Sequence, residues 1–238
     1  APAPGLAKFM KDGAAELASL AEETLTKSDG NGNVPIHSSR FVVEATRAFP
    51  KDGIMIRDGG ATVIFQWTYS QCKPHDVIWN QNFGHIGTGL PYATGAMLAD
   101  KAATGKQRPG MLLTSDSSFM FHIAELETAV RCKLPLVCVV GVDNAWGLEV
   151  GVYKRTFGQG TAETGTHWSK EVRFDKIGEG FGCHGEYVTR AQDIGPAIKR
   201  AYASGKVGVV HVVIDPKANS EEMPKYAEFR TWYAEGTQ

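Results

Sequence analysis

The sequence lacks an apolar run close to the ~20 consecutive residues that a membrane-spanning helix needs. It also lacks a cluster of lysine and arginine, since 25 basic residues stand against 26 acidic ones and the formal net charge is −1. Without a basic stripe that could follow a phosphate backbone, we expect no nucleic-acid partner. The N-terminus has no basic region followed by an apolar block, so we expect no signal peptide, no membrane partner and a cytoplasmic location.

Cysteine is scarce as well. The four cysteines form no C-x-x-C pair and occur at Cys72, Cys132, Cys138 and Cys183. This spacing argues against a zinc or iron–sulfur site, because such sites use closely spaced cysteine pairs. We expect free thiols in a reducing compartment.

Apolar residues are plentiful: they make up 42% of the 238 residues, enough for the core of one large α/β domain. Short apolar strands alternate with helices, which predicts a three-layer α-β-α fold with a doubly wound, mostly parallel sheet. The predicted strands are 53–57, 111–114, 136–140 and 207–214, and the predicted helices are 5–25, 40–49, 89–100, 119–131, 172–181 and 193–203. A polar break at 28–33 separates an N-terminal helix and linker (1–33) from the main domain (34–216), and a tail (217–238) follows.

Four turns are expected at the carboxyl ends of the strands, where ligands bind in such sheets. They are rich in glycines, acids and small hydroxyl residues, and they cover 58–62, 84–89, 115–118 and 142–149.

The turn Ser115-Asp116-Ser117-Ser118 joins a strand to a helix. N–H groups at a helix start attract anions, and Asp116 there would repel phosphate unless it held a cation that also binds the phosphate. Asp143 follows the next apolar strand, 27 residues after Asp116, so both acids should lie at the same rim. Two carboxylates, a loop carbonyl and phosphate oxygens would complete an octahedral Mg²⁺ site. The alternative is a simple helix N-cap formed by Asp116 or Ser115.

At this point the sequence resembles the thiamine-diphosphate (ThDP) enzymes of the pyruvate decarboxylase and acetolactate synthase kind. Their signature is Gly-Asp-Gly followed, one helix and one strand later, by Asn-Asn. The chain has Ser115-Asp116-Ser117, then Ala124-Glu125-Leu126-Glu127-Thr128-Ala129-Val130, then Val142-Asp143-Asn144. The resemblance extends from about 35 to 215 and implies the diphosphate-binding (PP) domain of that superfamily, which covers the main domain.

The resemblance implies a role for particular residues. Asp116, Asp143 and the backbone carbonyl of Ala145 correspond to the Mg²⁺ ligands. Ile86 corresponds to the bulky residue that supports the bent cofactor. Glu149 corresponds to a glutamate facing the reacting carbon, with His85 as a second catalytic candidate. The implied cofactor-binding residues are Gly60, Ala61, Thr62, Gly84, His85, Ile86, Ser115, Asp116, Ser117, Ser118, Asn144, Trp146 and Gly147.

Four positions depart from the family pattern. Serines replace the glycines that flank Asp116, Val142 replaces the first asparagine, and Asp143 adds a negative charge at the second. A shift of one residue would make Asn144 the metal ligand instead of Asp143. The alternatives to catalytic roles are a solvated loop position for Glu149, a structural role for His85, and a packing or capping role for His122.

The implied activity is that of a ThDP- and Mg²⁺-dependent C–C lyase or carboligase, acting on a 2-oxo acid, a 2-hydroxyacyl or an acyl-CoA substrate. Such enzymes need a glutamate from a pyrimidine-binding (PYR) domain, for which this chain has no room. We therefore expect a hetero-oligomer such as α₂β₂, or a fragment of a longer chain. The alternatives are the β subunit of a 2-oxoacid oxidoreductase and a non-enzymatic relative. The loop 151–168 and the tail 217–238 are expected to shape the substrate site or to pack between domains.

Overall fold

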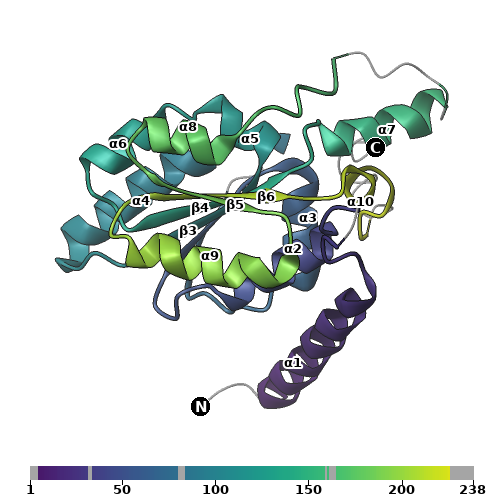
Figure 1. The fold of residues 1–238 in the computed structure, drawn as a ribbon. Coiled ribbons are helices and arrows are strands. Elements are labelled where there is room, and N and C mark those ends of the chain that lie inside the picture. The colour runs from purple at the N-terminus through teal and green to yellow at the C-terminus, as the bar shows by residue number, and fades with distance from the viewer. Residues whose placement is uncertain (1–4, 32–33, 80–83, 159, 161–164, 226–238) are drawn as a thin grey trace.

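The computed structural model of the chain describes residues 5–31, 34–79, 84–158, 160 and 165–225. A six-stranded sheet crosses its centre in the order β2-β1-β3-β4-β6-β5, and all neighbouring strands are parallel (Figure 1). The strands are β1 (Ile54–Arg57), β2 (Asp76–Ile78), β3 (Gly110–Ser115), β4 (Leu136–Val142), β5 (His184–Val188) and β6 (Gly208–Val213).

Helices cover both faces of the sheet, as expected from the alternating pattern. They are α1 (Leu6–Glu23), η1 (Thr24–Thr26), α2 (Ser38–Arg47), α3 (Gly60–Tyr69), α4 (Gly89–Thr104), α5 (Asp116–Phe121), α6 (Glu125–Arg131), α7 (Gly147–Phe157), α8 (Phe174–Gly180), α9 (Ala191–Ala203) and α10 (Pro216–Glu221). Figure 1 shows α2 and α9 below the sheet and α6 and α8 above it, and the core contacts place α3 on the face of α2 and α9 and α4 on the face of α6 and α8. The three-layer α/β fold predicted from the sequence is therefore confirmed.

The central strands are apolar because both of their faces are buried. Every residue of β3 and β4 is buried, and their apolar side chains alternate between two core clusters. Met111 and Leu113 face α2, α3 and α9, whereas Leu112 faces the cluster that includes Phe119 and Phe174. Strands buried on both faces are continuous apolar runs, which explains why these two were the easiest to predict.

The strand order reverses next to β1. From β1 the chain passes to β2 on one side, and it then crosses to β3 and β4 on the other. At such a switch point the connections leave in opposite directions and open a crevice beyond the carboxyl ends of the strands. The turns after β1, β3 and β4 all border this crevice.

Three helices lie outside the layers. The α7 helix extends beyond the sheet edge and packs against α10, while α1 stands away from the body of the domain (Figure 1). No helix within the described ranges has the length and apolar character needed to span a bilayer.

Several elements were not predicted from the sequence. β5 is polar (HGEYV), and β2 is a three-residue edge strand, so neither gives an apolar run. The first part of the expected 151–168 loop is helical as α7. The helix predicted to end at Arg131 is two helices, because the chain bends at His122, whose ring nitrogen Nδ1 lies 2.7 Å from the Gly87 carbonyl oxygen. This contact is consistent with the structural alternative expected for His122. The four cysteines are free, as expected.

His211 of β6 is a titratable side chain buried in the sheet, so its burial should make the stability of the fold depend on pH. Its Nδ1 accepts the Phe174 N–H at 3.2 Å, and burial lowers the pKa of the imidazole to about 4, against a smaller opposing effect of Asp175. Because the unfolded state takes up a proton at a pH near 6.5 and the folded state does not, stability is lost as the pH falls from about 7 to 4. The expected loss is about 3 kcal/mol.

We expect His211→Gln to lower stability at pH 7 and to remove this part of the pH dependence. The measurement is urea unfolding of both proteins between pH 7 and pH 4. If the free energy of unfolding changed equally with pH in the variant and the wild type, the pKa of His211 would not be lowered in the folded protein.

Candidate functional site

Two aspartates meet at the carboxyl edge of the sheet. Asp116 is the first residue of α5, directly after β3, and Asp143 directly follows β4. Because β3 and β4 are paired up to Ser115 and Gly141, the two acids leave the sheet side by side. Their carboxyl groups are within hydrogen-bonding contact, and the exposed fractions of the residues are 0% and 8%.

The groups that donate hydrogen bonds to this pair are all neutral. Asp116 accepts the N–H groups of Ser117 and Asn144, each at 2.8 Å. Asp143 accepts the Ala145 N–H at 3.2 Å and the Asn219 side-chain amide at 2.7 Å. Burial raises the pKa of both carboxyl groups, and the neighbouring charge of Asp143 raises that of Asp116 further. Two buried acids this close retain a proton unless a cation replaces it.

A cation at this pair would need further oxygen ligands. Within the described residues, no group of three or more His, Cys, Asp or Glu side chains lies together in a way that could hold a metal ion. The remaining ligands would have to be backbone carbonyls, a bound anion or water, which suits a Mg²⁺ ion shared with phosphate oxygens.

A small cleft, here called the polar cleft, opens above Asp143. Its lining residues are Gly60, Ala61, Thr62, Ile86, Ser115, Ser117, Asp143, Ala145, Gly147, Leu148, Glu149 and Asn219. The helices α3 and α7 begin here. The first N–H groups of a helix have no intrahelical acceptor, and in neither helix does a capping side chain accept from them. The buried Thr62 hydroxyl has no hydrogen-bond partner in the part of the chain that the structure describes. Unsatisfied donors beside an acid pair fit an anion that arrives with a divalent cation.

Asp58 holds the two glycine turns of the site together. Its carboxylate accepts the N–H groups of Gly59 at 2.7 Å, Gly87 at 3.1 Å and Gly89 at 2.7 Å. A side chain at Gly89 would collide with Asp58, since an added Cβ would lie 2.6 Å from the Asp58 Cβ. The turn after β1 and the turn before α4 are thereby fixed against each other.

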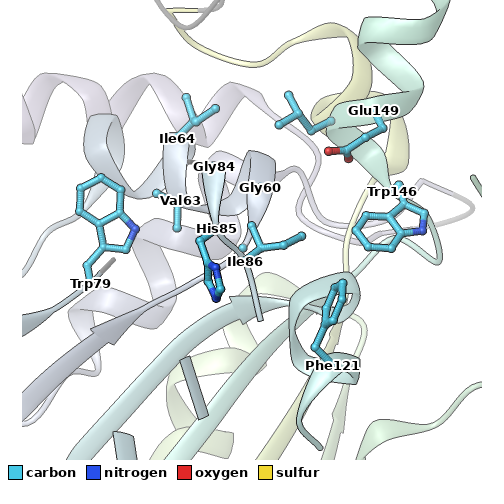
Figure 2. A pocket seen from close by; sticks show the side chains of 12 residues that line it. Gly60, Val63, Ile64, Trp79, Gly84, His85, Ile86, Phe121, Trp146 and Glu149 are labelled. Carbon is cyan, nitrogen blue, oxygen red and sulfur yellow. The ribbon is translucent and has the colours of Figure 1, made fainter. Parts of the chain in front are cut away.

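A larger cavity of about 260 Å³, here called the aromatic pocket, adjoins the polar cleft. It shares Gly60, Ile86, Leu148 and Glu149 with the cleft, so these residues lie at the junction of the two. Figure 2 shows Trp79, His85, Phe121 and Trp146 around its wall. Phe121 and Trp146 pack edge to face, with ring centroids 5.8 Å apart.

The two predicted catalytic side chains both reach this pocket. Glu149 lies on the first turn of α7 and directs its carboxyl group into the pocket (Figure 2). Burial raises the pKa of Glu149, and the charge of Asp143 adds to the effect. Glu149 is thus a partly desolvated helix residue and not a solvated loop residue. His85 is exposed, beside the half-buried Ile86.

Some predicted site residues are directed elsewhere. The Ser117 N–H is used by Asp116, and the Ser118 hydroxyl accepts a hydrogen bond from Ser115 at 3.4 Å. Asn144 adopts a left-handed backbone, φ 57°, and its side chain donates to the Ser169 carbonyl at 3.2 Å. Gly84 and Trp146 line the aromatic pocket and not the polar cleft, whereas Gly147 lines the cleft.

The flanking segments are only partly within the described residues. Lys154 and His167, from the loop expected at 151–168, line a third cavity together with Lys217 of α10. Residues 159 and 161–164 of that loop, and 226–238 of the tail, lie outside the described residues.

Two residues with a clear part in the site were missed. Asp58 ends β1, and its position beside Gly59 and Gly60 was a usable signal. Asn219 gave no signal, because it lies 76 residues from Asp143 in a short helix of the tail.

Comparison with known proteins identifies what the chain is similar to. Residues 58–212 match the family model described as the thiamine pyrophosphate enzyme, C-terminal TPP binding domain. The acetolactate synthase large subunit IlvG of Mycobacterium tuberculosis is 30% identical over 77% of this chain and 32% of its own length. The sulfoacetaldehyde acetyltransferase of Castellaniella defragrans is 28% identical over 75% of this chain and 28% of its own length.

Solved structures show the same fold. The benzoylformate decarboxylase of Polynucleobacter necessarius superposes with a TM-score of 0.69 at 19% identity, over 80% of this chain and 35% of that one. The chain spans about a third of the length of the curated relatives it matches.

The Asp58 contact predicts a large stability effect. Asp58→Ala leaves three buried N–H groups without an acceptor, so we expect the free energy of unfolding to fall by about 3 kcal/mol or more. Asp58→Asn keeps one accepting oxygen, so its free energy of unfolding should lie between those of Asp58→Ala and the wild type. Urea unfolding measures both, with Asp52→Ala, at an exposed turn position, as the control. If Asp58→Ala and Asp52→Ala lowered the free energy of unfolding equally, Asp58 would not be the residue that holds the two glycine turns together.

Proposed function

The chain belongs to the thiamine pyrophosphate enzymes, as their C-terminal cofactor-binding domain, and we propose that it forms the diphosphate- and Mg²⁺-binding half of a lyase or carboligase. Thiamine pyrophosphate and ThDP are the same compound. The proposed substrates are a 2-oxo acid, a 2-hydroxyacyl compound or an acyl-CoA. The relatives named above are a synthase, an acetyltransferase and a decarboxylase, which supports this range of lyase and transferase chemistry.

One observation supports the proposal most strongly. Among the described residues, a buried pair of acids has only neutral donors, and it borders a cleft in which the Thr62 hydroxyl has no hydrogen-bond partner. A divalent cation would compensate the carboxylates, and a diphosphate would accept hydrogen bonds from the cleft.

The proposed metal ligands are Asp116, Asp143 and the Ala145 carbonyl. Asp143 is favoured over Asn144, because Asp143 contacts Asp116 and lines the polar cleft, whereas Asn144 is not among the residues that line it. The proposed diphosphate contacts are Gly60, Ala61, Thr62, Ser115 and Ser117, which line the polar cleft, together with Ser118 beside it.

The aromatic pocket is the proposed place of the chemistry. When bound, ThDP supplies the nucleophilic carbon that adds to a substrate carbonyl. Ile86 lies at the junction of cleft and pocket, where it would separate the diphosphate region from the reacting region. Trp146 and Phe121, which pack edge to face, form one side of this pocket. Glu149, with its raised pKa, would donate a proton from its carboxyl group to the reacting carbon, and His85 would assist at the mouth.

A PYR domain is the proposed partner. It would come from a second subunit, in an assembly such as α₂β₂, or from another part of a longer polypeptide. The glutamate that activates the cofactor is supplied by that domain, so the chain described here should not turn over substrate by itself.

Cofactor titration tests the proposal. The protein is purified from its native coding region, with the flanking sequence or neighbouring subunit that supplies a PYR domain, and is titrated with ThDP and Mg²⁺ by calorimetry. We expect saturable binding that needs both ligands. Asp116→Asn and Asp143→Ala should each weaken Mg²⁺ binding by about 100-fold or more, since even loss of an outer-shell contact costs 10- to 100-fold.

The matched control is Asp175→Asn. Asp175 is also a buried aspartate, but it pairs with Arg173 at 2.6 Å, away from the site. The substitution Asp175→Asn should leave the affinity for Mg²⁺ unchanged. Absence of binding at millimolar ThDP and Mg²⁺ would refute the proposal and favour a non-enzymatic relative.

A second prediction concerns Glu149. Because its pKa is raised, its protonated form persists to higher pH, and a rate that depends on it falls as the pH rises through that pKa. Glu149→Gln should lower kcat by about 100-fold or more and remove this alkaline decline, with little change in ThDP affinity. The kcat–pH profile with pyruvate, or another 2-oxo acid that the assembly turns over, measures the effect. An unchanged profile would exclude Glu149 as the proton donor.

A further inference from the structure

The short helix α10 reaches the candidate metal site through one side chain. Asn219 lies in the middle of α10, is 2% exposed, and lines the polar cleft together with Asp143. The helix starts at Pro216, capped by the Asp215 carboxylate, and packs along α7. Asn219 is therefore brought to the site by the packing of the C-terminal segment and not by a strand end.

Asn219 bridges two parts of the fold. Its Nδ2 donates to the Asp143 Oδ2 at 2.7 Å, and its Oδ1 accepts from the Ser38 hydroxyl at 2.7 Å. An ionised carboxylate only accepts hydrogen bonds, so the amide nitrogen must face Asp143 and the amide oxygen must face Ser38. Since Ser38 is the first residue of α2, the amide is held in one orientation from both ends.

The Asn219 amide fixes the Asp143 carboxylate without neutralising it. By contrast, the buried Asp175 pairs with Arg173, and the half-buried Asp100 pairs with Arg108. Asp143 has instead the Ala145 N–H on Oδ1 and the Asn219 amide on Oδ2. A carboxylate that is oriented on both oxygens and left with its charge is suited to bind a cation.

The space for this contact depends on Gly147. A Cβ added at Gly147 would overlap the Asp143 Oδ2 and would lie 2.8 Å from the Asn219 Cβ. The first residue of α7 must therefore lack a side chain for Asn219 to approach Asp143. A second contact holds the two helices together, as the Arg155 Nη1 donates to the Ser220 carbonyl at 3.0 Å.

We propose that Asn219 is a positioning residue for Asp143, and that the divalent-cation site is completed only when α10 is packed against α7. The inference rests on the proposed function, because it requires that Asp143 is a cation ligand. Affinity for the cation then depends on a hydrogen bond from a segment remote in sequence from both acids.

The test replaces the amide by an apolar side chain of similar size. Mn²⁺ is titrated, in the presence of saturating ThDP, into wild type and Asn219→Leu purified from the native coding region, and free Mn²⁺ is read by electron paramagnetic resonance. We expect the variant to bind Mn²⁺ 10- to 100-fold more weakly, as is typical when an outer-shell partner is lost. The bound Mn²⁺ spectrum should also broaden as the carboxylate loses its fixed orientation.

Gln66→Met is the matched control. Gln66 is likewise a buried amide, 1% exposed, and its Nε2 donates to the Leu113 carbonyl at 3.1 Å. Both variants should lower the melting temperature, but only Asn219→Leu should lower Mn²⁺ affinity. Equal Mn²⁺ affinities of Asn219→Leu and wild type would overturn the inference and leave the proposed function intact. Failure of the wild type to bind Mn²⁺ would overturn both.

Discussion

The contact between two buried carboxyl groups, those of Asp116 and Asp143, is the constraint on which the site depends. Within the described residues neither group forms an ion pair, and all their donors are N–H groups of the backbone or an amide. Such a pair is unfavourable unless a proton or a cation lies between the oxygens. The parallel pairing of β3 and β4 maintains the contact, since it makes both strands end at the same level.

The backbone around the acid pair supplies hydrogen-bond donors, of which some are satisfied within the protein and some are not. Asp58 accepts three N–H groups from the two glycine turns and keeps them close to the sheet. The N-termini of α3 and α7 and the Thr62 hydroxyl are left to face the polar cleft. The polar cleft therefore combines negative charge with hydrogen-bond donors, which suits a cation bound together with a diphosphate.

The C-terminal segment connects the acid pair to other parts of the domain by hydrogen bonds. The hydrogen-bond path from Ser38 through Asn219 to Asp143 links the start of α2, the tail helix and the end of β4. The Glu222 carboxylate, one residue past α10, also contacts Lys27 at 2.8 Å and His37 at 3.4 Å, next to the same helix start. The segment before the domain and the segment after it thus meet beside the site, and both contribute to its rigidity.

The sequence by itself determined the parallel three-layer fold, the rim that holds the site, and the presence of Asp116 and Asp143 at two neighbouring strand ends. These features follow from local rules, because a strand buried on both faces is a continuous apolar run and its end must be a turn. Only the tertiary structure decided the polar elements β2 and β5, the helical state of Glu149, the direction of Asn144, and the contacts of Asp58 and Asn219. Each of these depends on atoms brought together from distant parts of the chain, and no local pattern of residue types records which donor a buried carboxylate will meet.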